Sequence, residues 1–354
     1  MKKLSVCILF GGVSPEHEVS LRSAQSVLEN IDHEKYNVFP VGITKDGDWV
    51  LFGGTDYSML PAGTWLNHEN NRRAAISPVR GQGLLSFENE CVVRERIDVV
   101  FPVLHGENGE DGSIQGLLQI AGIPYVGPHV ASSAVCMDKT LTKLVAGLAG
   151  VRQADWRLVT RSAWDRGADA VCEHVEEAFT YPVFVKPAGT GSSVGVSKAK
   201  NREDLREAIA FALKYDSKVL VEEFIHGREI EVAVLGNATP MASIPGEIDS
   251  GAEFYDYDAK YVTDTSTAHI PARIPEETAE KVRELAVKVY EAMGCRGLSR
   301  VDFFVTYEGG EVVFNEINTL PGFTSISMYP KLFVASGIPY ASLIDQLIEL
   351  AVEA

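Results

Sequence analysis

The chain has 354 residues, 45% of them hydrophobic and 23% charged, which excludes collagen-like, low-complexity and wholly disordered proteins. Its 49 acidic residues outnumber the 32 basic ones, so the net charge is −17. Such an acidic protein is poorly suited to binding nucleic acid or an anionic membrane. The length predicts two or three domains, each able to bury a core.

The amino terminus and the cysteines predict a cytoplasmic protein. No run of 18 apolar residues occurs, so we expect no membrane insertion. The first apolar run ends at Phe10 before two glycines, which is typical of a strand entering a loop and not of a signal peptide. The 5 cysteines are scattered and contain no Cys-x-x-Cys pair, so we expect reduced thiols.

The first hundred residues alternate strand and helix patterns, which is typical of a parallel sheet with ligand loops at its carboxyl edge. Two glycine-rich, acidic loops follow predicted strands, at residues 11–18 and 105–112. Neither has the G-x-G-x-x-G spacing of a dinucleotide-binding dehydrogenase. The pattern predicts strands at Leu4–Phe10, Tyr36–Ile43 and Asp98–Leu104, and helices at Val19–Leu28 and Ile114–Ala121.

From about Gly127 the pattern changes to hairpins and amphipathic helices. The segment 245–273 has little periodicity, and a loop of that length in a compact domain is usually functional. Strands are predicted at Trp156–Val159, Tyr181–Pro187, Val196–Lys198, Val219–Glu223, Glu229–Leu235, Ser299–Thr306 and Glu311–Ile317. Helices are predicted at Met137–Ala149, Arg202–Lys214, Glu276–Met293 and from Tyr340 onward.

The last predicted hairpin gathers charge on one face. A three-residue turn at 308–310 pairs Tyr307 with Glu311 and predicts two further cross-strand pairs, Asp302 with Glu316 and Arg300 with Asn318. Side chains two apart on a strand share a face. Opposed carboxylates repel, and carboxylate and amide oxygens are the ligands that Mg²⁺ prefers, so we interpret this patch as a metal site. A solvated face with an Arg ion pair is the alternative.

A second group of residues is suited to binding phosphate. Lys139, Lys186 and the Gly/Ser loop 189–195 supply cations, backbone N–H groups and hydroxyls. The loop joins two predicted strands and lacks the P-loop pattern, so it is either an ordinary flexible hairpin or a lid over ATP. The segment Val221–Ile225, followed by Glu229, has the apolar and acceptor groups of an inter-domain hinge that could hold a nucleoside. Taken alone, the segment is better interpreted as a plain edge strand.

Six ordered motifs resemble the D-alanine–D-alanine ligase family of the ATP-grasp superfamily, and the resemblance covers nearly the whole chain. They lie at residues 10–21, 104–116, 137–139, 185–195, 254–261 and 300–302 with 315–327. The resemblance implies an α/β fold of three domains: an N-terminal α/β domain at 1–126 with the first D-alanine site, a central ATP-grasp subdomain at 127–224 with the Gly/Ser lid, and a C-terminal ATP-grasp subdomain at 225–354 with the metal site and the omega-type loop 245–273.

The resemblance also implies a reaction and its partners. A cytoplasmic homodimer would use ATP and two Mg²⁺ or Mn²⁺ ions to join two D-alanines, through a D-alanyl phosphate, for peptidoglycan precursors. Motif by motif, the ATP residues are Lys139, Lys186, Ser193, Glu222, Glu223, Phe224, Ile225, Glu229 and Lys260. The metal ligands are Asp302, Glu316 and Asn318.

The same carry-over gives the catalytic and substrate residues. Glu16 would meet the ammonium of the first D-alanine, with His105 nearby, and Ser192 and Tyr261 would complete a hydrogen-bonded triad with it. Arg300 and the Gly322 N–H would stabilise the transferring phosphoryl group and the oxyanion. Ser327 and Met328 would line the second D-alanine site.

Two alternatives use the same scaffold. Related ligases that make D-alanyl-D-serine or D-alanyl-D-lactate alter the loop around Tyr261 and often place Arg after the serine matching Ser327. This chain has Met328 there, which favours D-alanine. A non-catalytic nucleotide-binding regulator would show damage at Arg300, Asp302, Glu316 or Asn318, and all four are intact.

Overall fold

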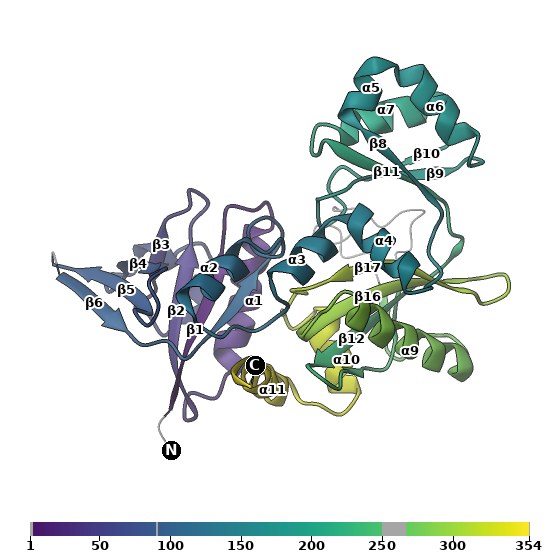
Figure 1. Ribbon diagram of the computed structural model, residues 1–354. Helices are drawn as coiled ribbons and strands as arrows, with labels where there is room; N and C mark the ends of the chain where they lie inside the picture. The colour runs from purple at the N-terminus through teal and green to yellow at the C-terminus, as the bar shows by residue number, and fades with distance from the viewer. Residues whose placement is uncertain (1–2, 90, 250–266, 354) are drawn as a thin grey trace.

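The computed structural model describes residues 3–89, 91–249 and 267–353, and within them the strands form three sheets in three lobes (Figure 1). The predicted residues Lys260 and Tyr261 lie outside the described part of the chain. In that part, no helix is both long and apolar enough to cross a membrane.

The first lobe has a seven-stranded sheet in the order β6-β5-β4-β3-β2-β1-β7. Only β2, β1 and β7 are parallel, so the expected parallel sheet is wrong for residues 49–95, where β3 to β6 run antiparallel. The links between β4, β5 and β6 are too short for the crossover that parallel strands need. The elements are β1 (Leu4–Gly11), α1 (His17–Asn30), β2 (Tyr36–Ile43), β3 (Trp49–Leu51), η1 (Tyr57–Met59), η2 (Trp65–Asn67), β4 (Arg72–Ile76), β5 (Leu84–Glu88), β6 (Cys91–Glu95), β7 (Val99–Leu104) and α2 (Ser113–Ala121).

The central lobe has a four-stranded antiparallel sheet in the order β10-β9-β11-β8, with its helices on one side (Figure 1). Val185, Leu205, Ile209 and Val219 form part of its buried core. The predicted hairpin around the Gly/Ser loop is confirmed by the pairing of β9 with β10. The elements are β8 (Trp156–Thr160), α5 (Arg161–Arg166), α6 (Ala168–Glu176), β9 (Val183–Pro187), β10 (Ser197–Ala199), α7 (Arg202–Ala212) and β11 (Lys218–Glu223).

The third lobe has a six-stranded sheet in which β15, β14, β12, β16 and β17 follow one another and β13 pairs with β12. Strands β14 and β15 occupy the two ends of the segment 245–273 that the sequence predicts as a loop, so that prediction is wrong at its ends; the middle lies outside the described residues. The elements are α3 (Val130–Met137), α4 (Lys139–Leu148), β12 (Gly227–Gly236), β13 (Met241–Ala242), β14 (Gly246–Asp249), β15 (Thr267–His269), α9 (Glu276–Ala292), β16 (Gly297–Thr306), β17 (Val312–Asn318), α10 (Met328–Ala335) and α11 (Tyr340–Val352).

The turn between β16 and β17 differs from the predicted one. The expected pairing of Tyr307 with Glu311 is wrong, because the ladder near the turn pairs Val305 with Val312, one residue out of the expected register. The connection is therefore a four-residue turn at 307–310, and the backbone N–H of Thr306 donates to the Glu311 carbonyl at 3.0 Å.

A β-bulge restores the predicted pairs farther along this hairpin. The register shifts between Asp302 and the next residue, which leaves Asn315 as the extra residue on β17. Beyond the bulge, Asp302 lies opposite Glu316 and Arg300 opposite Asn318, as predicted. The charged patch therefore forms on one face, as predicted, although the turn has four residues where three were expected.

Helix α11 joins the first and third lobes. Its buried residues Leu343, Ile344 and Leu347 share one hydrophobic core with Ile8 of β1 and Leu235 of β12. In Figure 1 the helix lies beneath the first lobe, beside the third. Because this core crosses the lobe boundary, the carboxyl-terminal helix fixes the first lobe against the third.

We expect Leu347→Ala to lower the free energy of unfolding by about 2–5 kcal/mol, because it opens a cavity in this shared core. Equilibrium urea unfolding measures the change. Val352→Ala on the same helix is the matched control, since Val352 is 44% exposed and its truncation should cost less than about 0.5 kcal/mol. Equal losses in the two variants would contradict the role given to α11.

Candidate active site

One cleft of about 780 Å³ is lined by residues from all three lobes. The first lobe contributes residues of α1 and of the loops after β1 and β7, and the central lobe contributes the Gly/Ser loop, Lys186 and Glu222. The third lobe contributes Lys139 at the start of α4, residues of β16 and β17, and the start of α10. Twelve predicted site residues line this cleft: Glu16, His105, Lys139, Lys186, Ser192, Glu222, Arg300, Glu316, Asn318, Gly322, Ser327 and Met328.

The guanidinium of Arg300 is held by two buried carboxylates. Its Nε and Nη2 donate to the two oxygens of Asp302 at 2.8 and 2.7 Å, and Nε also lies 3.2 Å from Glu231 Oε2. Strands β12 and β16 place Glu231 directly opposite Asp302. Burial by itself lowers the pKa of Arg300, but these carboxylates raise it well above its ordinary value, so the side chain stays a cation.

The predicted metal ligands are brought together on the β16–β17 hairpin. Glu316 and Asn318 line the cleft, while Asp302 lies behind them and is only 2% exposed. The Oδ1 of Asn318 is buried without a hydrogen-bond partner among the described residues, which is a donor suited to a cation. No cluster of three or more His, Cys, Asp or Glu side chains suited to a metal occurs in the described ranges, so the donor set here is two carboxylates and one amide.

The Gly/Ser loop contacts the first lobe at Glu16. Ser192 donates a hydrogen bond from Oγ to Glu16 Oε1, and both Ser192 and Ser193 have the left-handed backbone, with φ of 48° and 58°. Gly106 has a φ of 68°, which favours glycine, and a Cβ there would lie 2.7 Å from Glu16 Oε2 and displace this carboxylate. Ser192 therefore links the Gly/Ser loop to the first lobe at the cleft wall.

His105 is buried beside the loop that carries Gly322. Its Nδ1 lies 3.1 Å from the Leu320 carbonyl and its Nε2 lies 3.2 Å from Ser23 Oγ. Since a carbonyl only accepts, Nδ1 donates and the neutral ring accepts from Ser23. Burial lowers the pKa of His105, which favours this neutral form.

The loop before α10 is held by its own hydrogen bonds. The backbone N–H of Thr324 donates to Ser327 Oγ at 3.0 Å, and Ser327 immediately precedes the helix. A Cβ at position 322 would lie 2.8 Å from the same hydroxyl, so glycine keeps the backbone of residue 322 close to it. Met328 is buried in the first turn of α10, at the cleft wall.

Three of the predicted ATP residues line the cleft. Lys139 donates from Nζ to the Thr190 carbonyl at 2.5 Å, and Lys186 donates to Asn315 Oδ1 at 3.3 Å across the lobe boundary. The carboxylate of Glu222 is buried between lysines.

The other described ATP candidates are absent from the residues that line the cleft, as far as the structure describes them: Ser193, Glu223, Phe224, Ile225 and Glu229. Glu223 Oε1 accepts from Arg152 at 3.1 Å, because its side chain points to the opposite face of β11 from that of Glu222. Lys198 lies over the Phe224 ring at 4.2 Å from its centre.

Sequence reasoning missed three charged residues at this site. Glu231 lies two residues after Glu229 on one strand, so period-two spacing could have found it. Lys143 lies four residues after Lys139 on α4, on the same helical face, and Glu110 lies in the acidic loop that the sequence singles out. Glu110 lines the cleft, accepts from the Gly106 N–H at 2.9 Å, and leaves its buried Oε1 without a partner among the described residues.

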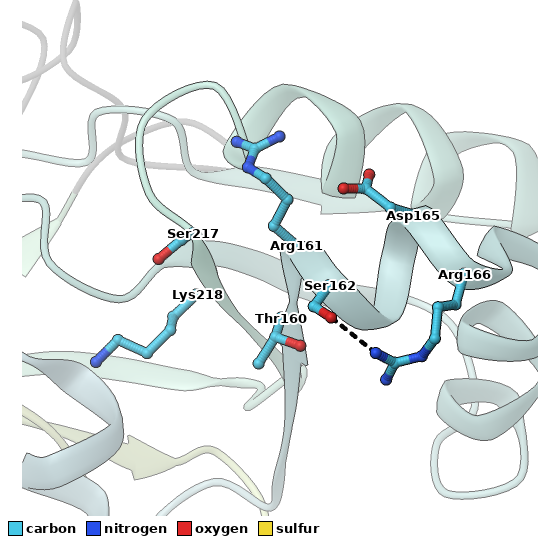
Figure 2. Close-up of a pocket in the computed structure, with 7 residues that line it drawn as sticks. All are labelled: Thr160, Arg161, Ser162, Asp165, Arg166, Ser217 and Lys218. Atoms are coloured by element: carbon cyan, nitrogen blue, oxygen red, sulfur yellow. Dashed lines mark hydrogen bonds between the residues drawn. The ribbon is translucent and has the colours of Figure 1, made fainter.

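A second hollow lies on the central lobe and is lined by other residues (Figure 2). Its basic side chains already have partners: Arg166 donates to Ser162 Oγ at 2.7 Å, and Lys218 pairs with Asp138. It contains none of the predicted site residues, so the cleft between the lobes is the candidate active site.

Comparisons with known proteins match the chain from end to end. The family model described as D-ala D-ala ligase N-terminus matches residues 5–128, and the one described as D-ala D-ala ligase C-terminus matches residues 145–349. The chain belongs to the D-alanine–D-alanine ligase family, and it is an ATP-dependent ligase of ATP-grasp fold.

Relatives and solved structures agree with this membership. The D-alanine–D-alanine ligases of Caldicellulosiruptor bescii and Acetivibrio thermocellus are each 52% identical, over 100% and 99% of this chain and 96% of their own. The VanG D-Ala:D-Ser ligase from Enterococcus faecalis is 39% identical with a TM-score of 0.90, over 99% of this chain and 100% of that one. The D-alanine–D-alanine ligase from Coxiella burnetii is 37% identical with a TM-score of 0.85, over 99% and 96%.

Glu110 gives this site a pH dependence. Burial, reinforced by the neighbouring Glu16, raises the pKa of Glu110 from 4.5 to about 8. A carboxyl whose pKa is raised on folding destabilises the fold increasingly as pH rises from its ordinary pKa to its folded one. We expect Glu110→Gln, which stays neutral, to gain about 2 °C or more in Tm over the wild type at pH 9 but not at pH 4.5.

Thermal unfolding without substrates at several pH values measures this difference. Glu107→Gln is the matched control, because Glu107 is exposed on the same loop. A difference between Glu110→Gln and the wild type that does not change with pH would contradict the buried, proton-holding state of Glu110.

Proposed function

We propose that the chain joins two D-alanines to D-alanyl-D-alanine, with ATP converted to ADP and phosphate. The observation that carries this proposal is the cleft in which Glu16, Ser192, Arg300, Gly322 and Ser327 meet from three lobes. The two relatives at 52% identity over nearly full length, both named for this reaction, support it.

The chemistry follows from the charges around the first substrate. Glu16, oriented by Ser192, binds the ammonium of the first D-alanine, with His105 nearby. A carboxylate oxygen of this D-alanine attacks the γ-phosphorus of ATP, and ADP leaves. Arg300 is the cation at the transferring phosphoryl group and stays charged, because Asp302 and Glu231 raise its pKa.

The second step forms the amide bond. Ser327 and Met328 line the place of the second D-alanine, whose amine attacks the acyl carbonyl and expels phosphate. The backbone N–H of Gly322 and the Arg300 guanidinium stabilise the oxyanion that forms. Two further lid residues, Tyr261 and Lys260, lie outside the described residues and are assigned from the family resemblance. Tyr261 completes the triad with Glu16 and Ser192, and Lys260 binds phosphate. A closed lid excludes water, which would hydrolyse an acylphosphate.

ATP occupies the space between the central and third lobes. Lys139, Lys186 and the Ser193 region bind its phosphates; Glu222, Glu223, Phe224 and Ile225 form the adenine site, and Glu229 meets the ribose. The two lysines that line the cleft and the Gly/Ser loop beside them support this placement.

Asp302, Glu316 and Asn318 would hold two Mg²⁺ or Mn²⁺ ions, which neutralise phosphate charge when bound. The unpartnered Asn318 oxygen and the facing carboxylates fit such ions. A carboxylate has about four lone-pair sites, so Asp302 can keep its bonds to Arg300 and still accept a cation.

Three broader proposals accompany the reaction. The domains divide at residues 1–126, 127–224 and 225–354, which places one sheet in the first and one in the second. The family resemblance supports a homodimer and a place in the cytoplasm, where the ligase would supply peptidoglycan precursors. Size-exclusion chromatography with light scattering tests the dimer.

We expect phosphate release from ATP and Mg²⁺ to be driven by D-alanine alone, with D-alanyl-D-alanine identified by mass as the product. Parallel reactions contain L-alanine, D-serine or D-lactate. Release only after D-serine is added would overturn the proposal in favour of the specificity named for the VanG relative, and release only after D-lactate is added would overturn it in favour of a D-alanine–D-lactate ligase. Silence with every substrate would favour a nucleotide-binding regulator.

We expect Glu316→Ala to lower kcat by at least about 100-fold, because it removes one of two carboxylates that would hold the cations. Steady-state phosphate release over a Mg²⁺ titration measures the effect and shows whether the Mg²⁺ requirement rises. Glu308→Ala, at the exposed turn of the same hairpin, is the matched control. An unchanged kcat and Mg²⁺ requirement in Glu316→Ala would contradict the metal site.

A further inference from the structure

A carboxylate shared by two lysines lies at the back of the cleft. Lys143 Nζ is 3.0 Å from Glu222 Oε1, and Lys186 Nζ is 2.8 Å from Glu222 Oε2. Glu222 and Lys186 line the cleft, whereas Lys143 is absent from its lining and its side chain is 2% exposed. Lys143 therefore acts on the cleft only through Glu222.

Three structural elements hold this cluster. Lys143 lies on α4, while Glu222 and Lys186 lie on the paired strands β11 and β9. Gln153 donates from Nε2 to the Lys143 carbonyl at 2.8 Å, and Lys143 Nζ lies 3.5 Å from the Ala154 carbonyl. Gln153 thus holds the backbone of Lys143, and the ammonium lies between the Glu222 carboxylate and the Ala154 carbonyl.

The charges in the cluster depend on one another. Burial by itself raises the pKa of Glu222, but Lys143 and Lys186 together lower it to about 2, so the carboxylate is ionised. Burial lowers the pKa of Lys143 despite this partner, whereas Lys186, which also faces Glu316 and Glu229, has a raised pKa. With both lysines charged, the cluster has one surplus positive charge, and it is on the cleft side at Lys186.

We propose that Lys143 is a positioning residue for the polyphosphate of ATP. Its ammonium binds one oxygen of Glu222, so that Glu222 does not fully neutralise Lys186 and the positive charge of Lys186 can bind the phosphates. Without Lys143, Glu222 neutralises Lys186 and can bind it through both oxygens. This inference rests on the proposed ATP site. It assigns to that site a residue, Lys143, that does not touch the nucleotide.

The test compares nucleotides that differ only in their phosphates. In calorimetric titrations with excess Mg²⁺, Lys143→Met should weaken ADP binding by about tenfold or more and adenosine binding by less than about threefold. In steady-state assays KM for ATP should rise in the same proportion, while KM for D-alanine stays unchanged. Lys281→Met, an exposed lysine on α9, is the control for the loss of one positive charge from the whole protein.

A double variant separates charge from folding. Lys143→Met with Glu222→Gln again leaves one positive charge at Lys186, so it should bind ADP more tightly than Lys143→Met alone. Removing both partners also avoids an unpaired buried charge, so this variant can be measured even if the single one does not fold. Equal losses for ADP and adenosine, or a double variant that binds ADP no more tightly than the single variant, would overturn the proposal. If the single variant does not fold, a double variant that loses about tenfold or more of the wild-type preference for ADP over adenosine would overturn it.

The product assay on the wild type distinguishes this inference from the proposed reaction. A wild type that binds ADP but makes no dipeptide would contradict the reaction, and the ADP-against-adenosine comparison would still decide the role of Lys143. A wild type that makes the dipeptide, with Lys143→Met unaffected in ADP binding, would contradict only the inference.

Discussion

One buried cation, the guanidinium of Arg300, determines how the cleft is built. Two carboxylates hold it, Asp302 through two hydrogen bonds and Glu231 from the neighbouring strand. A buried charge that loses its partner is strongly destabilising, so strands β12 and β16 must keep the register that brings these carboxylates to it. Asp302 of β16 is also paired with Glu316 of the next strand, β17. Adjacent strands therefore fix Arg300, proposed for phosphoryl transfer, relative to the proposed metal ligands.

Two charge clusters of opposite composition face each other across the lobe boundary. In one, two carboxylates flank Arg300; in the other, two lysines flank Glu222. Lys186 connects them through its hydrogen bond to Asn315, the bulge residue of β17. The lysine cluster suits an anionic polyphosphate and the carboxylate cluster suits cations, so a metal-bound nucleotide between them satisfies both.

Local patterns in the sequence predict the elements and one side of the site, whereas long-range contacts decide the rest. Period-two spacing and the cross-strand pairs place Arg300, Asp302, Glu316 and Asn318 together, although a bulge at Asn315 compensates for a turn of different length. Residues 49–95 form antiparallel strands that the pattern does not predict, because these strands are only three to five residues long, too short to show a clear period. Lys143 and Glu231 gain importance only from partners far along the chain, Glu222 and Arg300.

In the proposed reaction, the cleft transfers a phosphoryl group to a D-alanine carboxylate before the amide forms. D-alanine labelled with ¹⁸O in both carboxylate oxygens tests it directly, with mass analysis of the released phosphate. We expect one ¹⁸O atom in each phosphate, because the carboxylate oxygen that attacks the γ-phosphorus leaves with the phosphate. Phosphate without label, formed together with dipeptide, would contradict the acylphosphate route.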